Sequence, residues 1–269
     1  MQGSCNKWPS DVISGKIESK KKVFFNKKIA YFLKVLIVLL LYLQGNTMEN
    51  LNLQIKIKST LFVKDPESST LGRDIIAKSI EMINTLGFES FTFKKLGDAI
   101  GSNESSIYRY YANKHMLVIY LINWYWSWMD YKIVLHTSSL NNAEEKIKKS
   151  IELLVAEVKQ DSNFSFINEV LLNRIIITES SKAYHNKDVD DENEKGFYMV
   201  YKQVVQRVSD FILEYDSNYE FPHMLVSTII EGAHHQRYFA EHLPALTDVE
   251  EGRNNIIRFY TNLVFNTLK

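Results

Sequence analysis

Apolar residues recur at spacings of three and four between residues 75 and 86, which is the period of one face of an α-helix. Gly87 follows at the position where a glycine in a left-handed conformation commonly ends a helix. The pattern therefore predicts a first helix that ends at Leu86. Its inward stripe comprises Ile75, Ile76, Ile80, Ile83 and Leu86.

Two further helices are predicted beyond this point, with a glycine between them. Thr92 is a good N-cap for the second helix because its hydroxyl can accept a backbone N–H of the first turn. Gly101 supplies a sharp turn, and Ser102 or Asn103 then caps the third helix. The arrangement predicts a helix-turn-helix, a DNA-binding unit. The inward residues expected on the second helix are Leu96, Ala99 and Ile100.

The third helix combines an inward pair, Ile107 and Tyr111, with an outward face of donors, acceptors and flat rings that suit base edges and phosphates. Glu104 would repel phosphate, so it should accept from a cytosine amino group or be held away from the backbone. Asn113 caps a fourth helix whose first turn presents Lys114, a candidate phosphate contact. The outward-facing candidates are Asn103, Glu104, Ser105, Ser106, Tyr108, Arg109 and Tyr110.

Together, these residues resemble the N-terminal domain of the TetR family of one-component transcriptional regulators. The resemblance implies base contacts from the third helix, a phosphate contact from Lys114, and DNA contacts from Thr92 and Lys94 at the start of the second helix. Two positions depart from the family pattern. Gly97 replaces the usual alanine, which should weaken its helix by roughly 1 kcal/mol, and Phe93 replaces a small hydroxyl residue. The matching marks are Gly87 with Phe88, Thr92, Gly101, the run Ile107–Tyr111, and Asn113 with Lys114.

The rest of the chain also has the pattern of long helices, so the expected fold class is all-α. A three-helix DNA-binding domain over residues 71–118 precedes a larger helical domain for effector binding and dimerisation over residues 119–269. The expected helices of this second part are Lys114 to about Leu135, one opening after Asn141 or Asn142, Phe164 to Thr178, Gly196 to Tyr215, Pro222 to His242, and Val249 to Leu268, with an acidic loop from Asp188 to Glu194.

By the same resemblance, the second domain encloses a pocket for an unknown small-molecule effector. It also pairs with a second copy through the last two helices, as a symmetric dimer on a palindromic double-stranded DNA operator requires. Pocket candidates, each equally suited to the core, are Trp124, Trp128, Phe164, Phe166, Leu171, Ile175, Tyr198 and Tyr201. Trp126 cannot share the helix face of Trp124 and Trp128 and should meet a second surface. Interface candidates are Ile229, Ile230, Ala233, Ile256, Ile257, Tyr260, Val264 and Leu268.

Composition favours helices, since the 269 residues include only 4 prolines and 10 glycines. The 32 basic and 32 acidic residues cancel, but not evenly. Residues 1–47 carry 8 basic and 2 acidic groups, residues 48–118 carry 9 and 8, and residues 119–269 carry 15 and 22. Whole-chain charge therefore gives no support for nucleic-acid binding, and a DNA-binding face has to be a local patch.

The first 47 residues consist largely of a basic stretch followed by an apolar run. A lysine-rich stretch, Lys20 to Lys28, precedes an apolar run, Ile29 to Leu43, that is shorter than a membrane helix needs. We expect translation to begin at Met48, with a flexible arm over residues 48–70 and a cytoplasmic protein, in keeping with a single cysteine, Cys5. The alternative is anchoring at the inner membrane through residues 29–43.

One cluster on the expected helix from Pro222 to His242 has the spacing of a metal site. A single helix lacks the partner carboxylates, however, and we expect no metal or cofactor. It comprises Glu231, His234, His235, Glu241 and His242. The chain shows no nucleophile elbow, phosphate-binding glycine loop or zinc-protease motif, so we do not expect an enzyme. The sequence favours an effector-released repressor. The alternatives are a membrane-anchored helical interaction protein and a small-molecule carrier that does not read DNA.

Overall fold

The computed structural model describes residues 55–268 apart from positions 162, 163, 165, 251 and 254. The described residues form helices and turns and contain no strand, as the sequence predicts. The chain divides into two units, residues 1–52 and 53–269, and the first unit lies outside the described residues. The predictions for residues 1–47, including the apolar run, therefore fall outside them too. Within the described part, no helix has both the length and the apolar character to cross a membrane.

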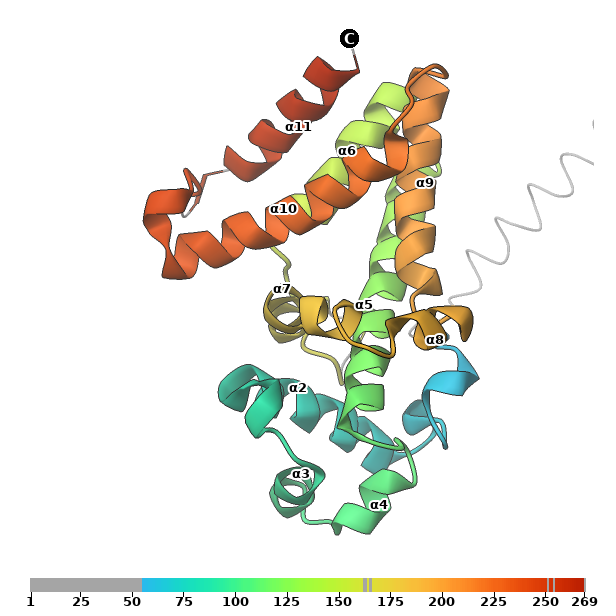
Figure 1. Ribbon diagram of the computed structural model, residues 1–269, viewed down its shortest axis with the longest axis vertical. Helices are drawn as coiled ribbons and strands as arrows, with labels where there is room; N and C mark the ends of the chain where they lie inside the picture. Colours follow the sequence, from blue (N-terminus) through green and yellow to red (C-terminus); the bar gives the residue numbers. More distant parts are fainter. Residues whose placement is uncertain (1–54, 162–163, 165, 251, 254, 269) are drawn as a thin grey trace, which may run out of the picture. The chain divides into compact units, whose positions relative to one another are not determined.

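The predicted DNA-binding end consists of α2 (Thr70–Ser90), α3 (Phe93–Ala99) and α4 (Glu104–Tyr108), followed by the long helix α5 (Lys114–Thr137) (Figure 1). Gly87 breaks α2 with a φ of 75° and a ψ of 157°. The regular part of that helix therefore ends at Leu86, which confirms the prediction, and a short turn carries the chain into α3.

Short polar residues start these four helices. The side chains of Ser69, Thr92, Asn103 and Asn113 accept hydrogen bonds from the backbone N–H groups of the residues three positions later. Such caps satisfy donors that have no partner within the helix. Three of the caps match the predicted helix starts, with Asn103 rather than Ser102 at the start of α4.

The inward face of α3 differs from the prediction. Ala99 is exposed and Ile100 is only partly buried, whereas Phe93, Leu96 and Gly97 are buried. A Cβ atom at Gly97 would lie 2.8 Å from the backbone oxygen of Ser102. The glycine thus weakens α3 locally but permits the start of α4 to approach it closely.

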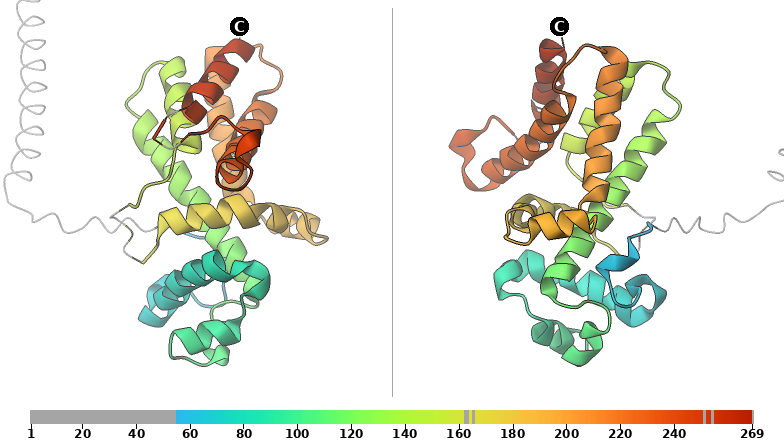
Figure 2. Two further views of the ribbon diagram at one scale, coloured as in Figure 1. Left: turned by 90° about the vertical axis from the view of Figure 1, so that its left-hand side faces the viewer. Right: turned by 45° about the vertical axis from the view of Figure 1, so that its right-hand side comes forward.

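Helix α5 runs from the DNA-binding end into the centre of the helical body, where it packs against α6 (Ala143–Val155), α7 (Glu169–Tyr184) and α9 (Met199–Tyr215). Every residue from Leu117 to Trp126 is buried, as expected for a helix that is apolar all round. Figure 2 shows α7 lying across α5, while α6 and α9 run along it.

The C-terminal helices are α10 (Pro222–His242) and α11 (Asn255–Thr267), joined through the 3₁₀ turn η3 (Pro244–Leu246). Helix α10 has the predicted bounds, with Pro222 at its first position. Helix α11 packs against α6 and α10. It starts later than predicted, and α7 also starts later, after its cap at Asn168. The predicted acidic loop from Asp188 to Glu194 instead contains a short helix, α8 (Val189–Glu194).

The described part of the predicted flexible arm is packed on the DNA-binding end. It forms two 3₁₀ turns, η1 (Ser59–Leu61) and η2 (Pro66–Ser68), and Leu61 is fully buried. The backbone N–H of Val63 donates to the carbonyl of Tyr110 at 2.8 Å. Residues 55–69 are therefore part of the folded unit, because apolar contacts that no local pattern reveals hold them in place.

Candidate DNA-binding surface and ligand-binding core

The exposed face of α4 carries most of the predicted DNA-contacting side chains. Tyr108 is 48% exposed, and Asn103, Ser105 and Arg109 are also exposed. The carbonyl oxygen of Asn103 accepts from Ser105 Oγ at 2.6 Å as well as from the backbone, so its amide group is the part that it can offer outward. Tyr108 donates to half-buried Glu104 at 3.3 Å, which keeps that carboxylate occupied within the helix.

Two predicted DNA contacts point inward instead. Tyr110 is only 3% exposed, and its hydroxyl lies 2.9 Å from Ser69 Oγ. Ser106 is buried and donates to Asn103 at 2.8 Å. For Tyr110 the physical reason is the shortness of α4, whose regular part ends at Tyr108, so the next residues turn toward the core; Ser106 lies within α4, on the buried side with Ile107. Tyr111 is fully buried, as predicted.

Lys114, a predicted phosphate contact, has hydrogen-bond partners within the chain. Its Nζ donates to the carbonyl oxygens of Phe88, Glu89 and Phe91 at 3.0, 3.2 and 3.3 Å, and it lies 4.5 Å from the centre of the Phe88 ring. Carbonyls at the end of a helix lack internal partners and attract a cation. Lys114 therefore holds the turn between α2 and α3, and its ammonium group is already engaged.

The start of α3 lies beside the exposed face of α4. Thr92 and Lys94 are exposed, while Phe93 is buried and packs edge-on against Tyr108 with ring centres 5.1 Å apart. The departure at Phe93 thus replaces a surface group with a support for the Tyr108 ring. Sequence reasoning missed this role, although an apolar residue directly after a cap was the available signal.

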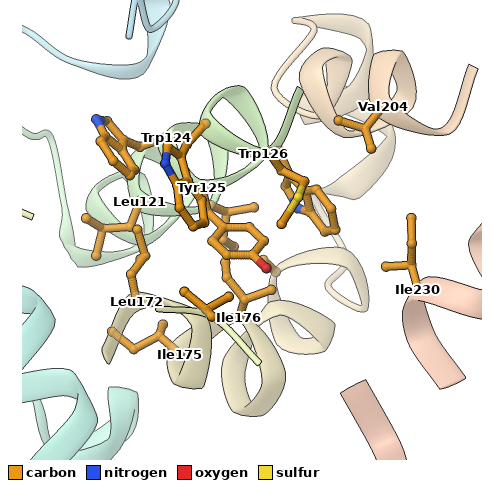
Figure 3. Packing of buried hydrophobic residues seen from close by; sticks show 14 of the residues in the cluster. Leu121, Trp124, Tyr125, Trp126, Leu172, Ile175, Ile176, Val204 and Ile230 are labelled. Atoms are coloured by element: carbon orange, nitrogen blue, oxygen red, sulfur yellow. The ribbon is translucent and has the colours of Figure 1, made fainter. Parts of the chain in front are cut away.

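The predicted pocket residues separate into two groups on opposite sides of α5. Trp124 stacks on Trp128 with ring centres 6.5 Å apart and meets Phe164 edge-on at 5.2 Å. Figure 3 shows Trp124 on the side of Leu121 and Leu172, which belong to α5 and α7. Trp124, Trp128, Phe164 and Ile175 are buried, and Phe166 and Leu171 are partly buried.

The second group surrounds Trp126, which occupies another face of α5 as predicted. Its ring stacks on Tyr201 with centres 4.4 Å apart, and Tyr201 stacks in turn on Tyr184 at 5.6 Å. Tyr198 meets Tyr184 edge-on. Figure 3 places Trp126 toward Val204 and Ile230, on α9 and α10. Tyr198 and Tyr201 therefore belong with Trp126 and not with Trp124.

A buried carboxyl group lies at the start of α7, next to the first group. Glu169 Oε2 accepts from Gln160 Nε2 at 2.5 Å and from the backbone N–H of Asp161 at 3.2 Å, whereas Oε1 has no hydrogen-bond partner among the described residues. Burial raises the pKa of Glu169 to about 7. Lys132 lies 4.2 Å from the centre of the Trp128 ring, and burial lowers its pKa.

Polar contacts join the DNA-binding end to the body. In the first turn of α5, His115 Nε2 lies 2.6 Å from Oε1 of Glu192, a buried residue of α8 that also accepts from the Tyr198 hydroxyl. Farther along α5, Asn123 donates to the carbonyl of Phe197 at 2.8 Å. Movement of α8 or of the start of α9 would therefore act directly on the base of α5.

The predicted interface residues lie inside the chain. All eight are buried or partly buried, because α10 and α11 turn them toward α6, α9 and each other. The large apolar side chains that these two helices expose are different ones. They include Met224 (67% exposed), Tyr238, Phe259 (56% exposed) and Leu263.

The Glu and His side chains with metal-site spacing on α10 are spread over different faces of the helix. Within the described ranges, no group of three or more His, Cys, Asp or Glu side chains is placed to hold a metal ion. His234 is buried, whereas His235 is exposed, with its Nδ1 2.9 Å from the carbonyl of Glu231. The i, i+3 and i+4 spacings along α10 thus distribute these residues between the core and the surface.

The fold of the chain is similar to that of several proteins of known structure. Its fold is similar to that of AibR, in a crystal structure with isovaleryl coenzyme A and operator DNA (TM-score 0.50, 12% identity, 71% of this chain and 95% of that chain). It is also similar to the fatty acid degradation regulator FadR from Bacillus halodurans (0.51, 13%, 72% and 96%) and to the superantigen PfiT (0.50, 13%, 76% and 97%). These identities show a shared fold, and the superantigen among them shows that the fold alone does not determine function.

No curated protein sequence shows significant similarity to the chain. Residues 75–121, which include the capped helices α3 and α4 and the start of α5, match the family model described as bacterial regulatory proteins, tetR family. The match therefore falls on the segment whose geometry is that of a helix-turn-helix. On this evidence, residues 75–121 are similar to the tetR family of bacterial regulatory proteins, and the similarity of the remaining residues to known proteins is one of fold.

Proposed function

We propose that the chain is a transcriptional repressor that binds operator DNA as a homodimer and leaves it when a small molecule binds the helical body. The observation that carries this proposal is the exposed polar face of α4, within the segment that matches the family model. Asn103, Ser105, Tyr108 and Arg109 offer donors, acceptors and a flat ring on one short helix that can enter a major groove.

The contacts divide by chemistry. Arg109 offers a guanidinium group for guanine edges or phosphate, while Thr92 and Lys94 at the exposed start of α3 suit the sugar-phosphate backbone. Lys114 contributes indirectly by fixing the turn between α2 and α3. The proposed DNA-binding part, residues 71–118, and the proposed effector and dimerisation part, residues 119–269, share α5, so a shift of that helix changes the position of the DNA-binding end.

Pairing of two copies is supported by the apolar side chains that α10 and α11 expose. Met224, Tyr238, Phe259 and Leu263 would leave water in a symmetric interface. A palindromic operator presents two half-sites, so a dimer places one copy of α4 on each. The AibR crystal structure contains isovaleryl coenzyme A and operator DNA, and FadR is a fatty acid degradation regulator, which is consistent with an effector-responsive regulator.

The test is binding of the full chain to labelled DNA from the region upstream of its own gene, with a scrambled duplex as competitor and with salt varied. We expect Arg109→Ala and Tyr108→Ala each to reduce specific affinity by roughly tenfold or more. Lys78→Ala is the matched control, because Lys78 lies on α2 and pairs with Glu81 at 2.7 Å.

Unchanged affinity in both α4 variants would reject the assignment of the DNA-binding surface. Binding that does not distinguish the two duplexes, with a steep salt dependence, would reject specific reading of this DNA, because phosphate contacts alone produce that behaviour.

A further inference from the structure

Helix α10 turns two basic side chains toward the interior of the body. His234 and Arg237 are three residues apart, so they share one face of the helix. His234 is 6% exposed, and its Nδ1 atom is buried with no hydrogen-bond partner among the described residues. An imidazole nitrogen without a partner is costly to bury, so this position favours a ligand that supplies one.

Arg237 is a half-buried cation with unused hydrogen-bonding capacity. Within the described part of the chain, its guanidinium group donates one hydrogen bond, from Nη2 to the carbonyl oxygen of Val155 at 2.5 Å. A guanidinium group has five N–H donors in a fixed planar arrangement that matches a carboxylate. Burial lowers the pKa of Arg237, which means that the surroundings do not fully compensate its charge.

The two basic groups act on each other. Burial is the main cause that lowers the pKa of His234 to about 4, and the positive charges of His235 and Arg237 lower it further. His234 is therefore neutral at pH 7 in the free protein. The other titratable groups around this face are Tyr125 on α5, Tyr184 on α7, the exposed Glu157 after α6, and Glu231 and Glu241 on α10 itself.

Of these carboxylates, the one on Glu231 is already engaged. Glu231 accepts a hydrogen bond from the Tyr201 hydroxyl at 2.9 Å, and the carboxyl groups of Glu157 and Glu241 belong to exposed residues. No ion pair to His234 or Arg237 occurs within the described residues. The face thus has a positive charge and an unpaired nitrogen, with no bound anion from its own chain.

Aromatic and aliphatic side chains surround the basic pair. The Trp126 ring centre lies 6.3 Å from that of His234, and Ile230 is buried one turn earlier on α10. Figure 3 shows Trp126 and Ile230 on the same side of α5. Tyr125 completes this surface, with its hydroxyl directed to Asn173 at 2.8 Å. A ligand held here would meet basic groups at one end and rings at the other.

We propose that this face of α10 binds a small apolar organic acid, with His234 and Arg237 holding the carboxylate and Trp126 contacting the hydrocarbon part. An organic cation would be repelled by Arg237, and a plain hydrocarbon would leave His234 Nδ1 unpaired. On binding, the carboxylate stays ionised and the imidazole takes one proton from solvent, so each ligand is bound with uptake of up to one proton. Binding of the acid at this face does not depend on the proposed function. Only the release of DNA by the bound acid rests on it.

The test is isothermal titration calorimetry of the full chain with octanoate and with 1-octanol, which share a tail and differ in the carboxylate. We expect octanoate to bind at least tenfold more tightly than 1-octanol. Its binding heat should vary with the ionisation heat of the buffer, because a proton is taken up. His234→Gln should abolish that variation, and both His234→Gln and Arg237→Met should reduce octanoate affinity by roughly tenfold or more.

His235→Gln is the matched control, since this neighbour is exposed and should bind octanoate like the unchanged protein. Arg237→Lys keeps the positive charge and should retain more affinity than Arg237→Met, which separates loss of charge from loss of fold. Equal binding of octanoate and 1-octanol, or no octanoate binding, would overturn the proposal. Unchanged affinity in both His234→Gln and Arg237→Met would do the same.

A DNA-release measurement separates this proposal from the proposed function. Release of the operator by octanoate, lost in His234→Gln, would support both. Octanoate that binds with the expected proton uptake but leaves DNA affinity unchanged would support the acid site and contradict its role as the effector site. Specific DNA binding together with no octanoate binding would contradict the acid site alone.

Discussion

In the DNA-binding end, α2, α3, α4 and α5 all begin at a short polar residue whose side chain accepts a backbone N–H. In the helical body, α6 and α7 have such caps but α9 and α10 begin without one, and a buried carboxyl oxygen of Glu169 and a buried nitrogen of His234 have no partner among the described residues. Local caps thus fix every helix start of the first region, whereas in the second region only some helix starts have a local cap.

This difference separates two ways of responding to a signal. A region in which every helix is capped resists distortion, since each helix start is fixed by its own cap. A region with buried ionisable groups responds to protons and ligands, because each group can gain or lose charge or a partner. The first would suit the proposed DNA-binding surface, and the second would suit the proposed response to a ligand.

The largest expected effect comes from the protonation of His234. Its pKa is about 4 in the folded protein and ordinarily 6.5, so the unfolded chain takes up a proton first as the pH falls. The unfolding free energy is therefore unaffected by the protonation of His234 above pH 6.5 and falls as the pH drops toward 4, by about 3 kcal/mol in all. His234→Gln should reduce the loss of unfolding free energy between pH 7 and pH 4.5, measured by urea denaturation.

Glu169 should give the opposite pH dependence in the same measurement. Its pKa is about 7 in the folded protein and ordinarily 4.5, so the folded state keeps a proton that the unfolded state releases. The contribution of protonated Glu169 to the unfolding free energy is fully present below pH 4.5 and is lost as the pH rises through 7. Glu169→Gln should therefore flatten the neutral side of the profile and His234→Gln the acid side. Identical profiles for both variants and the unchanged protein would contradict this account of the body.

A smaller effect should distinguish two glycines, one in each region. A Cβ atom at Gly97 would lie 2.8 Å from a backbone oxygen, whereas one at Gly232 would meet the hydroxyl at the end of the Tyr260 side chain. Backbone cannot move aside easily, so Gly97→Ala should cost about 2 kcal/mol even though alanine favours helices. Gly232→Ala should cost less, because the tyrosine can shift. Thermal unfolding of both variants gives the comparison, and equal losses would contradict it.

The smallest effect concerns two equivalent caps. Asn103 starts α4 and Asn142 starts α6, each by accepting a backbone N–H. Replacement of either by alanine should cost about 1 kcal/mol of unfolding free energy. Only Asn103→Ala should also weaken specific DNA binding, because its carbonyl orients Ser105 as well. A matching loss of DNA affinity in Asn142→Ala would mean that the two regions are not as independent as their caps indicate.

The features that could be predicted from the sequence are those with local causes. Thr92 and Asn113 were correct as caps because a cap needs only the next three residues. The bounds of α10 were correct because Pro222 marks a first helical position. The break at Gly87 was correct for the same reason, since a positive φ is a property that glycine itself confers.

The errors share a distant cause. Sequence reasoning missed the three carbonyl partners of Lys114, which come from residues 23 to 26 positions earlier and which spacing does not show. Tyr110 was expected to face outward because α4 was expected to continue past Tyr108. The acidic segment was expected to be a loop, but Glu192 is buried between side chains from two other helices. The same limit explains why the pairing of His234 and Arg237 was not predicted.

The position of the tryptophans on α5 gives the molecule a built-in optical reporter. Three of the four tryptophans of the chain are Trp124, Trp126 and Trp128, all buried in the body, and α2, α3 and α4 contain none. Their ultraviolet fluorescence emission therefore responds to changes on the two sides of α5 and does not respond to changes confined to α4. A change in that emission when DNA is added would show that contact at one end of α5 alters the packing at the other.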